Sequence, residues 1–275
     1  MSAAPQLDVL LPVVMSREVR DGDWVSHGAS VPLAGAALFM AAELHAPDID
    51  IWVQGWVNPR NRDLADALIA PERLAASAEA HMSQTEIINF SLRGNATFQF
   101  LRPLQVDPFG NVNVSLARRE GKPPLRFHGI AVGDAINAIG RVCLYVTEHS
   151  PRVFPEQLAF RTGTGHHDGS DWRPSHGLPD AGPHSVVTPL AVLGFDAGRR
   201  LEIRSVHPGV TLEQVQAATG FELGVADGAG ETPPPTEAEL AALERVDPAG
   251  IRRLEFGATR REVLKYLAAR VEESR

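Results

Sequence analysis

Apolar positions along the chain fall into short blocks separated by polar loops, a pattern typical of alternating strands and helices. Residues 23–26 predict a short strand, and the Ala- and Leu-rich stretch 33–44 predicts a helix that must end before Pro47. Residues 49–53 predict a second strand. Strand, glycine-containing loop, helix and strand form a βαβ unit, which implies parallel strands with functional loops at their carboxyl ends.

Capping boxes predict three further helices, because a Ser or Thr followed three residues later by Glu or Gln satisfies the first free N–H groups of a helix. They begin at Ser83, Thr211 and Thr236. Apolar alternation around the turn 196–198 predicts an antiparallel hairpin between residues 186 and 205. The chain therefore mixes strands and helices throughout.

The C-terminal residues predict a last amphipathic helix, with Val263, Leu267 and Val271 on one stripe. We therefore expect one domain over residues 1–250 and a helical extension over residues 251–275. The stripe suits docking on the chain's own domain as well as on a partner.

Two polar segments predict loops. Residues 118–124 are charged and contain prolines, and residues 162–185 consist mainly of Gly, His, Asp, Pro and Ser. The second segment holds five candidate metal ligands, but their spacing fits no closed zinc pattern and a solvated surface loop is favoured, so no metal is predicted. These ligands are His166, His167, Asp168, His176 and His184.

Composition narrows the range of partners. The 275 residues carry a formal net charge of -8 and no basic run longer than an arginine pair, which argues against nucleic-acid binding. The only cysteine, Cys143, lies in an apolar run, so a disulfide within the chain is impossible. No targeting segment or membrane span is evident, and we expect a cytoplasmic protein that acts on small molecules or proteins.

The stretch from Gln105 to Asn113 is the first candidate site. It follows an apolar strand, 98–101, and gathers Gln105, Asp107, Asn111 and Asn113. Such groups either close a tight turn by bonding their own backbone or handle a ligand at a strand end. A second candidate is the loop bounded by Gly129 and Gly133, whose backbone N–H groups can face an anion or an oxyanion at a helix start.

The first stretch resembles a family signature. Gln105-Val-Asp107 followed by Gly110-Asn111-Val-Asn113 is similar to the Q-V-D-x-x-G-N-x-N signature of the β subunit of class I CoA-transferases of the glutaconate CoA-transferase type. Further similar blocks bring the resemblance to roughly residues 20–250. These blocks are Val187–Val192, Arg204–Thr211, Ala218–Glu222 and Thr232–Thr236.

The resemblance implies an α/β fold of the NagB/RpiA/CoA-transferase type, an open sheet with flanking helices. It also implies a CoA-transferase α-like partner subunit, in a heterodimer or heterotetramer, and an acyl-CoA substrate, with coenzyme A entering only as part of that substrate. Gln105, Asp107, Asn111 and Asn113 then shape a substrate loop, and Gly129 and Gly133 line an oxyanion site.

The family's nucleophile is missing. In the transferases that this chain resembles, a glutamate in an E-x-G at the end of the second strand attacks the thioester, whereas the corresponding positions here read Val53-Gln54-Gly55. An amide is a very poor nucleophile but can orient water or a carbonyl. The chain also resembles, in lacking this glutamate, the ring-opening hydrolases of bacterial steroid degradation, which use water and a carboxylate of the α subunit. We therefore expect a hydrolytic or base- and water-mediated reaction; transfer with a nucleophile supplied elsewhere and a non-catalytic scaffold remain alternatives.

Other residues near this strand end are candidates by chemistry. His27 titrates near neutrality and is a candidate general base, although a loop histidine is more often solvated. Trp52 and Trp56 flank Gln54 and, with Gly55, either wall a substrate pocket or belong to the core or a subunit interface. The predicted site is thus Gln54 and His27 for catalysis, with the remaining residues for substrate binding.

Overall fold

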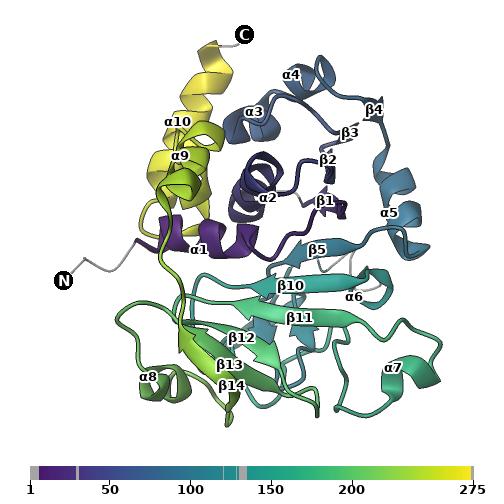
Figure 1. Ribbon diagram of the computed structural model, residues 1–275, viewed down its shortest axis with the longest axis vertical. Coiled ribbons are helices and arrows are strands. Elements are labelled where there is room, and N and C mark those ends of the chain that lie inside the picture. The colour runs from purple at the N-terminus through teal and green to yellow at the C-terminus, as the bar shows by residue number, and fades with distance from the viewer. Residues whose placement is uncertain (1–5, 29–30, 120, 128, 130–134, 274–275) are drawn as a thin grey trace. The chain divides into compact units, whose positions relative to one another are not determined.

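The structure is a computed structural model that describes residues 6–28, 31–119, 121–127, 129 and 135–273. Two compact units divide the chain: the first comprises the described residues up to Ile87 and those from Pro234 onward, and the second runs from Ile88 to Pro233. Figure 1 shows helices and strands mixed along the chain. None of the helices in the described part is both long and apolar enough to cross a membrane.

The first unit combines a small sheet with a helical cluster (Figure 1). In the sheet, β1 and β2 are parallel, and β2, β3 and β4 follow one another antiparallel. Helix α5 (Gln84–Leu92) crosses the boundary to the second unit. The other elements are α1 (Leu7–Ser16), β1 (Trp24–His27), α2 (Pro32–Leu44), β2 (Asp50–Val53), β3 (Trp56–Val57), α3 (Leu64–Ile69), α4 (Pro71–Ala75), β4 (Ala80–His81), α9 (Glu237–Val246), η1 (Ile251–Glu255) and α10 (Arg260–Glu273).

Helix α2 is the core of the first unit. Its residues from Pro32 to Ala42 are all buried, because α1, α9 and η1 pack around it. A helix that is apolar on all sides must be enclosed in this way. Pro32 occupies the first turn, where its missing N–H costs nothing, and the helix ends at Leu44, before Pro47. The C-terminal segment thus closes the core that β1 and β2 border.

Six strands of the second unit are paired side by side in the order β14-β13-β12-β11-β10-β5. Strands β5, β10 and β11 are parallel, β12 is antiparallel to β11 and β13, and β14 is parallel to β13. The elements of this unit are β5 (Phe98–Leu101), β6 (Gln105–Val106), β7 (Val112–Asn113), β8 (Leu116–Arg119), β9 (Lys122–Arg126), α6 (Ala135–Ala138), β10 (Arg141–Tyr145), α7 (Trp172–Ser175), β11 (Gly182–Val187), β12 (Ala191–Phe195), β13 (Leu201–Val206), α8 (Leu212–Ala217) and β14 (Gly224–Glu231).

Most elements expected from local signals are confirmed. β1 and β2 flank α2 as a parallel pair, as the βαβ pattern predicts. The capping boxes at Thr211 and Thr236 are both complete, with the side chain and the backbone bonded reciprocally. β12 and β13 form the expected antiparallel pair. The α/β fold class is therefore confirmed.

Two loop predictions are wrong. The described residues of 118–124, which are 118–119 and 121–124, lie in an antiparallel hairpin, β8–β9, which forms a two-stranded sheet of its own. Residues 162–185 are not simply a solvated loop, because the segment includes α7 and the start of β11. It also buries three polar side chains, Arg173 and Ser185 at 0% exposure and His166 at 8%. Sequence reasoning also missed α1, whose internal Pro12 hides a helical pattern.

The C-terminal residues form η1 and α10, with Val263 and Leu267 buried as the apolar stripe requires. Both elements belong to the first unit. The division into a domain over residues 1–250 and an extension over residues 251–275 stays a prediction. Thr259 precedes α10, but its hydroxyl donates to the Arg253 carbonyl at 2.8 Å.

Candidate functional site

Gln54 lies at the tip of the β2–β3 hairpin. Val53 pairs with Trp56, so Gln54 and Gly55 form a two-residue connection between antiparallel strands. Both have positive φ, +52° and +100°, which matches the primed turns that suit the twist of a hairpin. Gln54 is exposed and held in the left-handed region that non-glycine residues rarely adopt. Strain of this kind is often kept at functional sites.

The two tryptophans beside the turn differ in exposure. Trp52 is 7% exposed, and its indole N–H donates to the Met82 carbonyl at 2.7 Å. Trp56 is half-buried and meets the ring of His81 edge to face, with centroids 4.9 Å apart. Trp52 therefore completes the core, whereas Trp56 and His81 leave some surface beside Gly55. Their part in substrate binding stays a prediction.

His27 ends β1 and lies opposite Val53 in the parallel register. It is 2% exposed, and neither ring nitrogen has a hydrogen-bond partner of good geometry among the described residues. Burial lowers the pKa of His27 to about 4, opposed only in part by the backbone of Val31. The ring is therefore neutral at pH 7, and it lies inside the unit rather than in the solvated loop that the sequence favours.

Space for the His27 ring comes from α2. A Cβ on Gly35 would lie 2.4 Å from Nε2, so any side chain there would displace the imidazole. Phe39, one turn further along α2, stacks on the ring at a centroid distance of 6.5 Å. A glycine in a helix interior costs about 0.5–1 kcal/mol relative to alanine. Here it makes room for a buried histidine beside the strand that leads to Gln54.

In the second unit, Asp107 and Asn111 close the turn between β6 and β7. Oδ1 of Asp107 accepts from the backbone N–H groups of Phe109 and Asn111, both at 3.0 Å, and Oδ2 accepts from Asn111 Nδ2 at 2.7 Å. Gly110 has φ +68°, as the turn requires. Asn111 also bonds the backbone N–H of Gly165 and both backbone groups of His167. The turn is thus tied to a segment more than 50 residues away.

Gln105 and Asn113 pair across the same two strands. Asn113 Nδ2 donates to Gln105 Oε1 at 2.8 Å and to the Leu116 carbonyl at 2.7 Å, while its Oδ1 accepts from the backbone of Ser115 and Leu116. Gln105 Oε1 accepts in addition from the Ala159 N–H. These amides satisfy the backbone of three segments. They shape the loop, and direct contact with a substrate stays a prediction.

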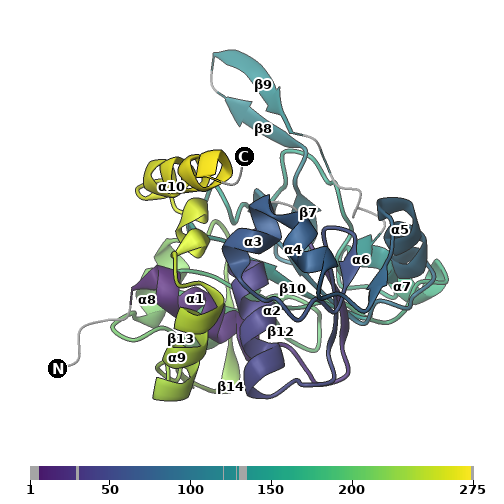
Figure 2. The ribbon, with the colours of Figure 1, turned by 90° about the horizontal axis from the view of Figure 1, so that it is seen from above.

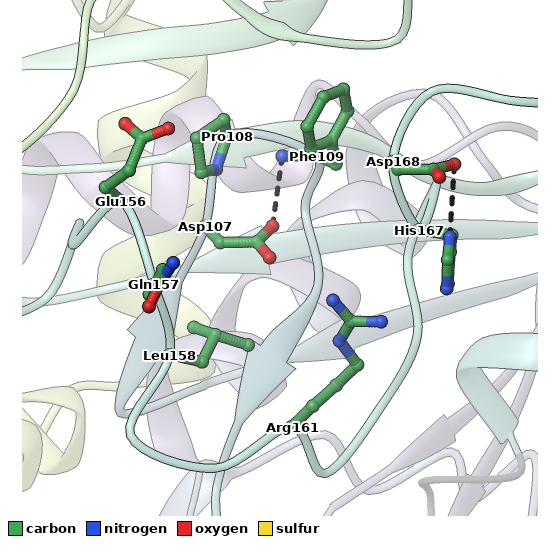
Figure 3. A pocket seen from close by; sticks show the side chains of 9 residues that line it. All are labelled: Asp107, Pro108, Phe109, Glu156, Gln157, Leu158, Arg161, His167 and Asp168. Atoms are coloured by element: carbon green, nitrogen blue, oxygen red, sulfur yellow. Dashed lines mark hydrogen bonds and ion pairs between the residues drawn. The ribbon is translucent and has the colours of Figure 1, made fainter.

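The Asp107 turn borders a cavity of about 400 Å³ (Figure 3). In the figure the Arg161 guanidinium points toward the Asp107 carboxylate, and Arg161 lowers the pKa of that carboxyl. Burial acts in the opposite direction and prevails, so the pKa of Asp107 is raised overall. The lining residues are Asp107, Pro108, Phe109, Glu156, Gln157, Leu158, Arg161, His167 and Asp168.

Sequence reasoning missed Arg161 and the role of His167 at this cavity. His167 has φ +60°, stacks on Trp172 with centroids 5.0 Å apart, and lies 3.1 Å from Asp168 through its Nδ1. Hydrogen bonds from Ser170, and then from His167, lower the pKa of Asp168. The hydrogen bonds to Asn111, together with the His166 N–H that donates to the Phe109 carbonyl at 2.9 Å, fix this segment at the cavity, and no local pattern in the sequence signals them.

The second glycine loop is described only at its start. Gly129 has φ +72°, and a Cβ there would meet Ser115 Oγ at 3.4 Å. Gly133 lies outside the described residues. An oxyanion site formed by this loop stays a prediction.

A comparison with models of known protein families finds no match. The chain is 31% identical over 240 residues to the B-type subunit of the 3-oxoadipate CoA-transferase of Pseudomonas knackmussii, covering 86% of this chain and 92% of that protein. It is 28% identical to the B-type subunit of the glutaconate CoA-transferase of Acidaminococcus fermentans, covering 86% and 90%. It is 33% identical over 153 residues to the cholesterol ring-cleaving hydrolase IpdB subunit of Rhodococcus jostii, covering 54% and 58%.

Solved structures agree on the fold. The decarboxylase AibA/AibB superimposes with a TM-score of 0.76 at 23% identity, covering 92% of this chain and 99% of the matched chain. Rhodococcus jostii IpdAB superimposes with a TM-score of 0.73 at 21% identity, covering 90% and 96%. The expected open α/β sheet with flanking helices is therefore confirmed.

Proposed function

We propose a function from the premise that the chain belongs to the CoA-transferase family, as a subunit of the B type. With an A-type partner subunit it would act on an acyl-CoA thioester, and the reaction would use water rather than a glutamyl thioester on this chain. The relatives named as subunits of this type support the partner and the class of substrate. The observation that carries the water-mediated step is Gln54, an exposed amide on a strained turn where the resemblance implies a glutamate.

The chemistry of Gln54 favours positioning over covalent catalysis. Its amide N–H can donate to a thioester carbonyl, and its Oε1 can accept a hydrogen bond from water. In hydrolysis the water oxygen bonds to the carbonyl carbon, the carbon–sulfur bond breaks, and the thiol leaves with the proton that the water gives up. The general base would come from the partner subunit. The His27 ring, with its pKa near 4, holds a proton too weakly for efficient catalysis at pH 7 unless substrate binding changes its surroundings.

A transferase remains the second candidate, because the relatives matched over about nine-tenths of their length are both named CoA-transferases. The acyl group would then pass through a nucleophile outside the Val53–Gly55 turn, on this chain or on the partner. The third candidate is a scaffold subunit whose partner performs all the chemistry.

The leading proposal is tested by measuring the free thiol of coenzyme A that hydrolysis of an acyl-CoA releases. The complex with its A-type partner is mixed with a panel of acyl-CoA thioesters, and free thiol is measured with and without an acceptor carboxylate. Hydrolysis predicts thiol release at a rate that does not depend on the acceptor. Transfer would instead consume the acyl-CoA only when the acceptor is present, and it would release no free thiol because the CoA thiol passes to the acceptor.

A matched pair of proteins locates any covalent intermediate. Borohydride or hydroxylamine is added during turnover, and all peptides of the chain, including the one that contains residue 54, are weighed by mass spectrometry. We expect no adduct on the wild-type chain, whereas Gln54→Glu restores a carboxylate and makes an adduct possible there. An adduct anywhere on the wild-type chain would refute the proposal.

The scaffold alternative makes a separate prediction. Gln54→Ala, which changes an exposed side chain, would then leave turnover nearly unchanged. A loss of about 100-fold in kcat, the size expected when a positioned polar group is removed, would exclude it.

A further inference from the structure

The β8–β9 hairpin projects from the rest of the second unit, at the top of Figure 2. Its strands pair only with each other, and every residue of β9 is exposed. A two-stranded hairpin alone in water is marginally stable at best. The hairpin therefore gains little from its own sheet, and most of both of its faces is exposed, apart from the half-buried Leu116 and Ala117 at its base.

The base of the hairpin is nevertheless firmly held. Asn113, which is fully buried, bonds both backbone groups of Leu116, and the Phe127 N–H donates to the Ser115 carbonyl at 3.0 Å. Ser115 Oγ in turn accepts from the Thr162 hydroxyl at 2.9 Å. The hairpin is thus anchored to the loop that borders the Asp107 cavity.

The two faces of the hairpin differ in chemistry. Leu116 pairs with Arg126, and Arg119 pairs with Lys122, so these side chains lie on one face, which we call the basic face. Leu125, 43% exposed, lies on the other, apolar face. Phe127, two residues on and 38% exposed, continues it.

The basic face carries uncompensated charge. Arg119 and Lys122 lie directly opposite each other, which is unfavourable for like charges. The Arg119 guanidinium donates to the Pro123 carbonyl, but neither Lys122 nor Arg126 has an ion-pair partner among the residues that the structure describes. In a chain of net charge -8, this concentration of positive charge calls for an anionic surface.

We propose that the β8–β9 hairpin is a docking arm that enters an acidic, apolar-lined groove of the A-type partner subunit. The inference rests on the proposed function, which supplies that partner. A protein groove can cover both faces at once, whereas a small anion such as coenzyme A would satisfy only the basic one. Exposed aromatic and arginine side chains are the residue types that protein interfaces favour.

The contact is made through side chains. Pro123 and Pro124 have no N–H groups, so β9 is a poor template for an added strand. Acidic side chains of the partner would pair with Arg119, Lys122 and Arg126, while Leu125 and Phe127 would lose their exposure to water.

The experiment measures the dissociation constant of the full-length chain for its A-type partner at about 50 mM and about 300 mM salt. One variant carries Arg119→Glu, Lys122→Glu and Arg126→Glu, and we expect about 100-fold weaker binding at low salt, with a smaller salt dependence than the wild type. A second variant carries Leu125→Ser and Phe127→Ser, and we expect about 10-fold weaker binding at both salt concentrations.

A matched control carries the same change in charge at exposed sites elsewhere, Arg20→Glu, Arg93→Glu and Lys265→Glu, and should bind as the wild type does. Because the arm lies outside the core, thermal unfolding of both arm variants should stay within about 2 °C of the wild type. Failure of either arm variant to fold would show instead that the hairpin supports its own unit.

Three results would overturn the inference: arm variants that bind like the control, unchanged binding with a raised KM for acyl-CoA, or self-association of the wild-type chain through the arm. If the wild type forms an active complex and the arm variants bind equally well, only the inference fails. A wild-type chain that forms no active complex with the A-type subunit removes the proposed function as well.

Discussion

Gln54 should be suboptimal for stability. For a non-glycine residue with φ near +52°, the left-handed backbone costs about 1–2 kcal/mol. Gln54→Gly removes this cost but adds about 0.5–1 kcal/mol of backbone entropy in the unfolded chain. Gln54→Asn removes part of the cost because asparagine tolerates this conformation and Asn-Gly is the preferred sequence for such a turn. The Gln54 side chain is exposed, so little packing is lost. Both variants should therefore raise the free energy of unfolding by about 0.5–1 kcal/mol.

Urea unfolding of the purified chain measures this change, and the variants should unfold with an unchanged m-value at a higher urea concentration. Gln157→Asn is the matched control, because Gln157 is also exposed but does not have positive φ; it should stay within about 0.5 kcal/mol of the wild type. In the complex, kcat should fall by about 100-fold in both variants, since Asn places its amide about 1 Å short and Gly has none. If both variants unfold more easily than the wild type, the turn is not strained and the reasoning is refuted.

Three further results are expected. Burial lowers the pKa of His27 and of His149 to about 4, so the folded protein keeps both rings neutral while the unfolded chain protonates them below pH 6.5. Each histidine should therefore cost up to about 3 kcal/mol of unfolding free energy as the pH falls from 6.5 to 4. Urea unfolding between pH 7.5 and 4.5 should show this decline, and a flat profile would contradict it. His27→Leu removes two buried nitrogens that have no hydrogen-bond partner of good geometry, so it should raise the unfolding free energy at pH 7 by about 1 kcal/mol and weaken its pH dependence. A loss of stability at pH 7 would show that the imidazole ring makes a stabilising hydrogen bond. Glu255→Ala removes the carboxylate that accepts a hydrogen bond from the Leu33 N–H at 2.8 Å at the start of α2. Thermal unfolding should show a loss of about 1–2 kcal/mol in stability. Recovery of that stability in Glu255→Gln would identify the lost hydrogen bond as the cause.

The elements that sequence patterns predicted well are those whose signals are local. A capping box such as that at Thr211 or Thr236 is complete within four residues, so its hydrogen bonds follow from the sequence. The parallel pairing of β1 with β2 follows from the right-handed βαβ rule without knowledge of side-chain contacts. In the same way, the turn at Gly110 follows from the glycine and the Asx residues around it.

The features that were missed depend on distant partners. The side chain of Arg173 is buried because the carbonyls of Gly165, Asn137 and Pro179 accept from its guanidinium, and these groups are spread over more than 40 residues. Strand β9 of the β8–β9 hairpin contains two prolines, and prolines within a segment argue against predicting a strand there. Its base is fixed by Asn113, which pattern reasoning assigns to a substrate loop.

The stretch from Gln105 to Asn113 and the β2–β3 turn therefore have different roles, although the family signature alone suggests that the stretch binds the substrate. The side chains of Asp107 and Asn111 already make hydrogen bonds within the protein. A ligand that bonded to one of them in place of its present partner would leave a buried polar group unsatisfied, which costs about 1–3 kcal/mol. Gln54 has the opposite properties, because its side chain is exposed and its backbone is held in an unfavourable conformation. A residue that is strained and packs against little is free to meet a substrate. The resemblance thus locates the family through the stretch that frames the cavity, while we propose that the reaction depends on Gln54, a position where the chain departs from that family.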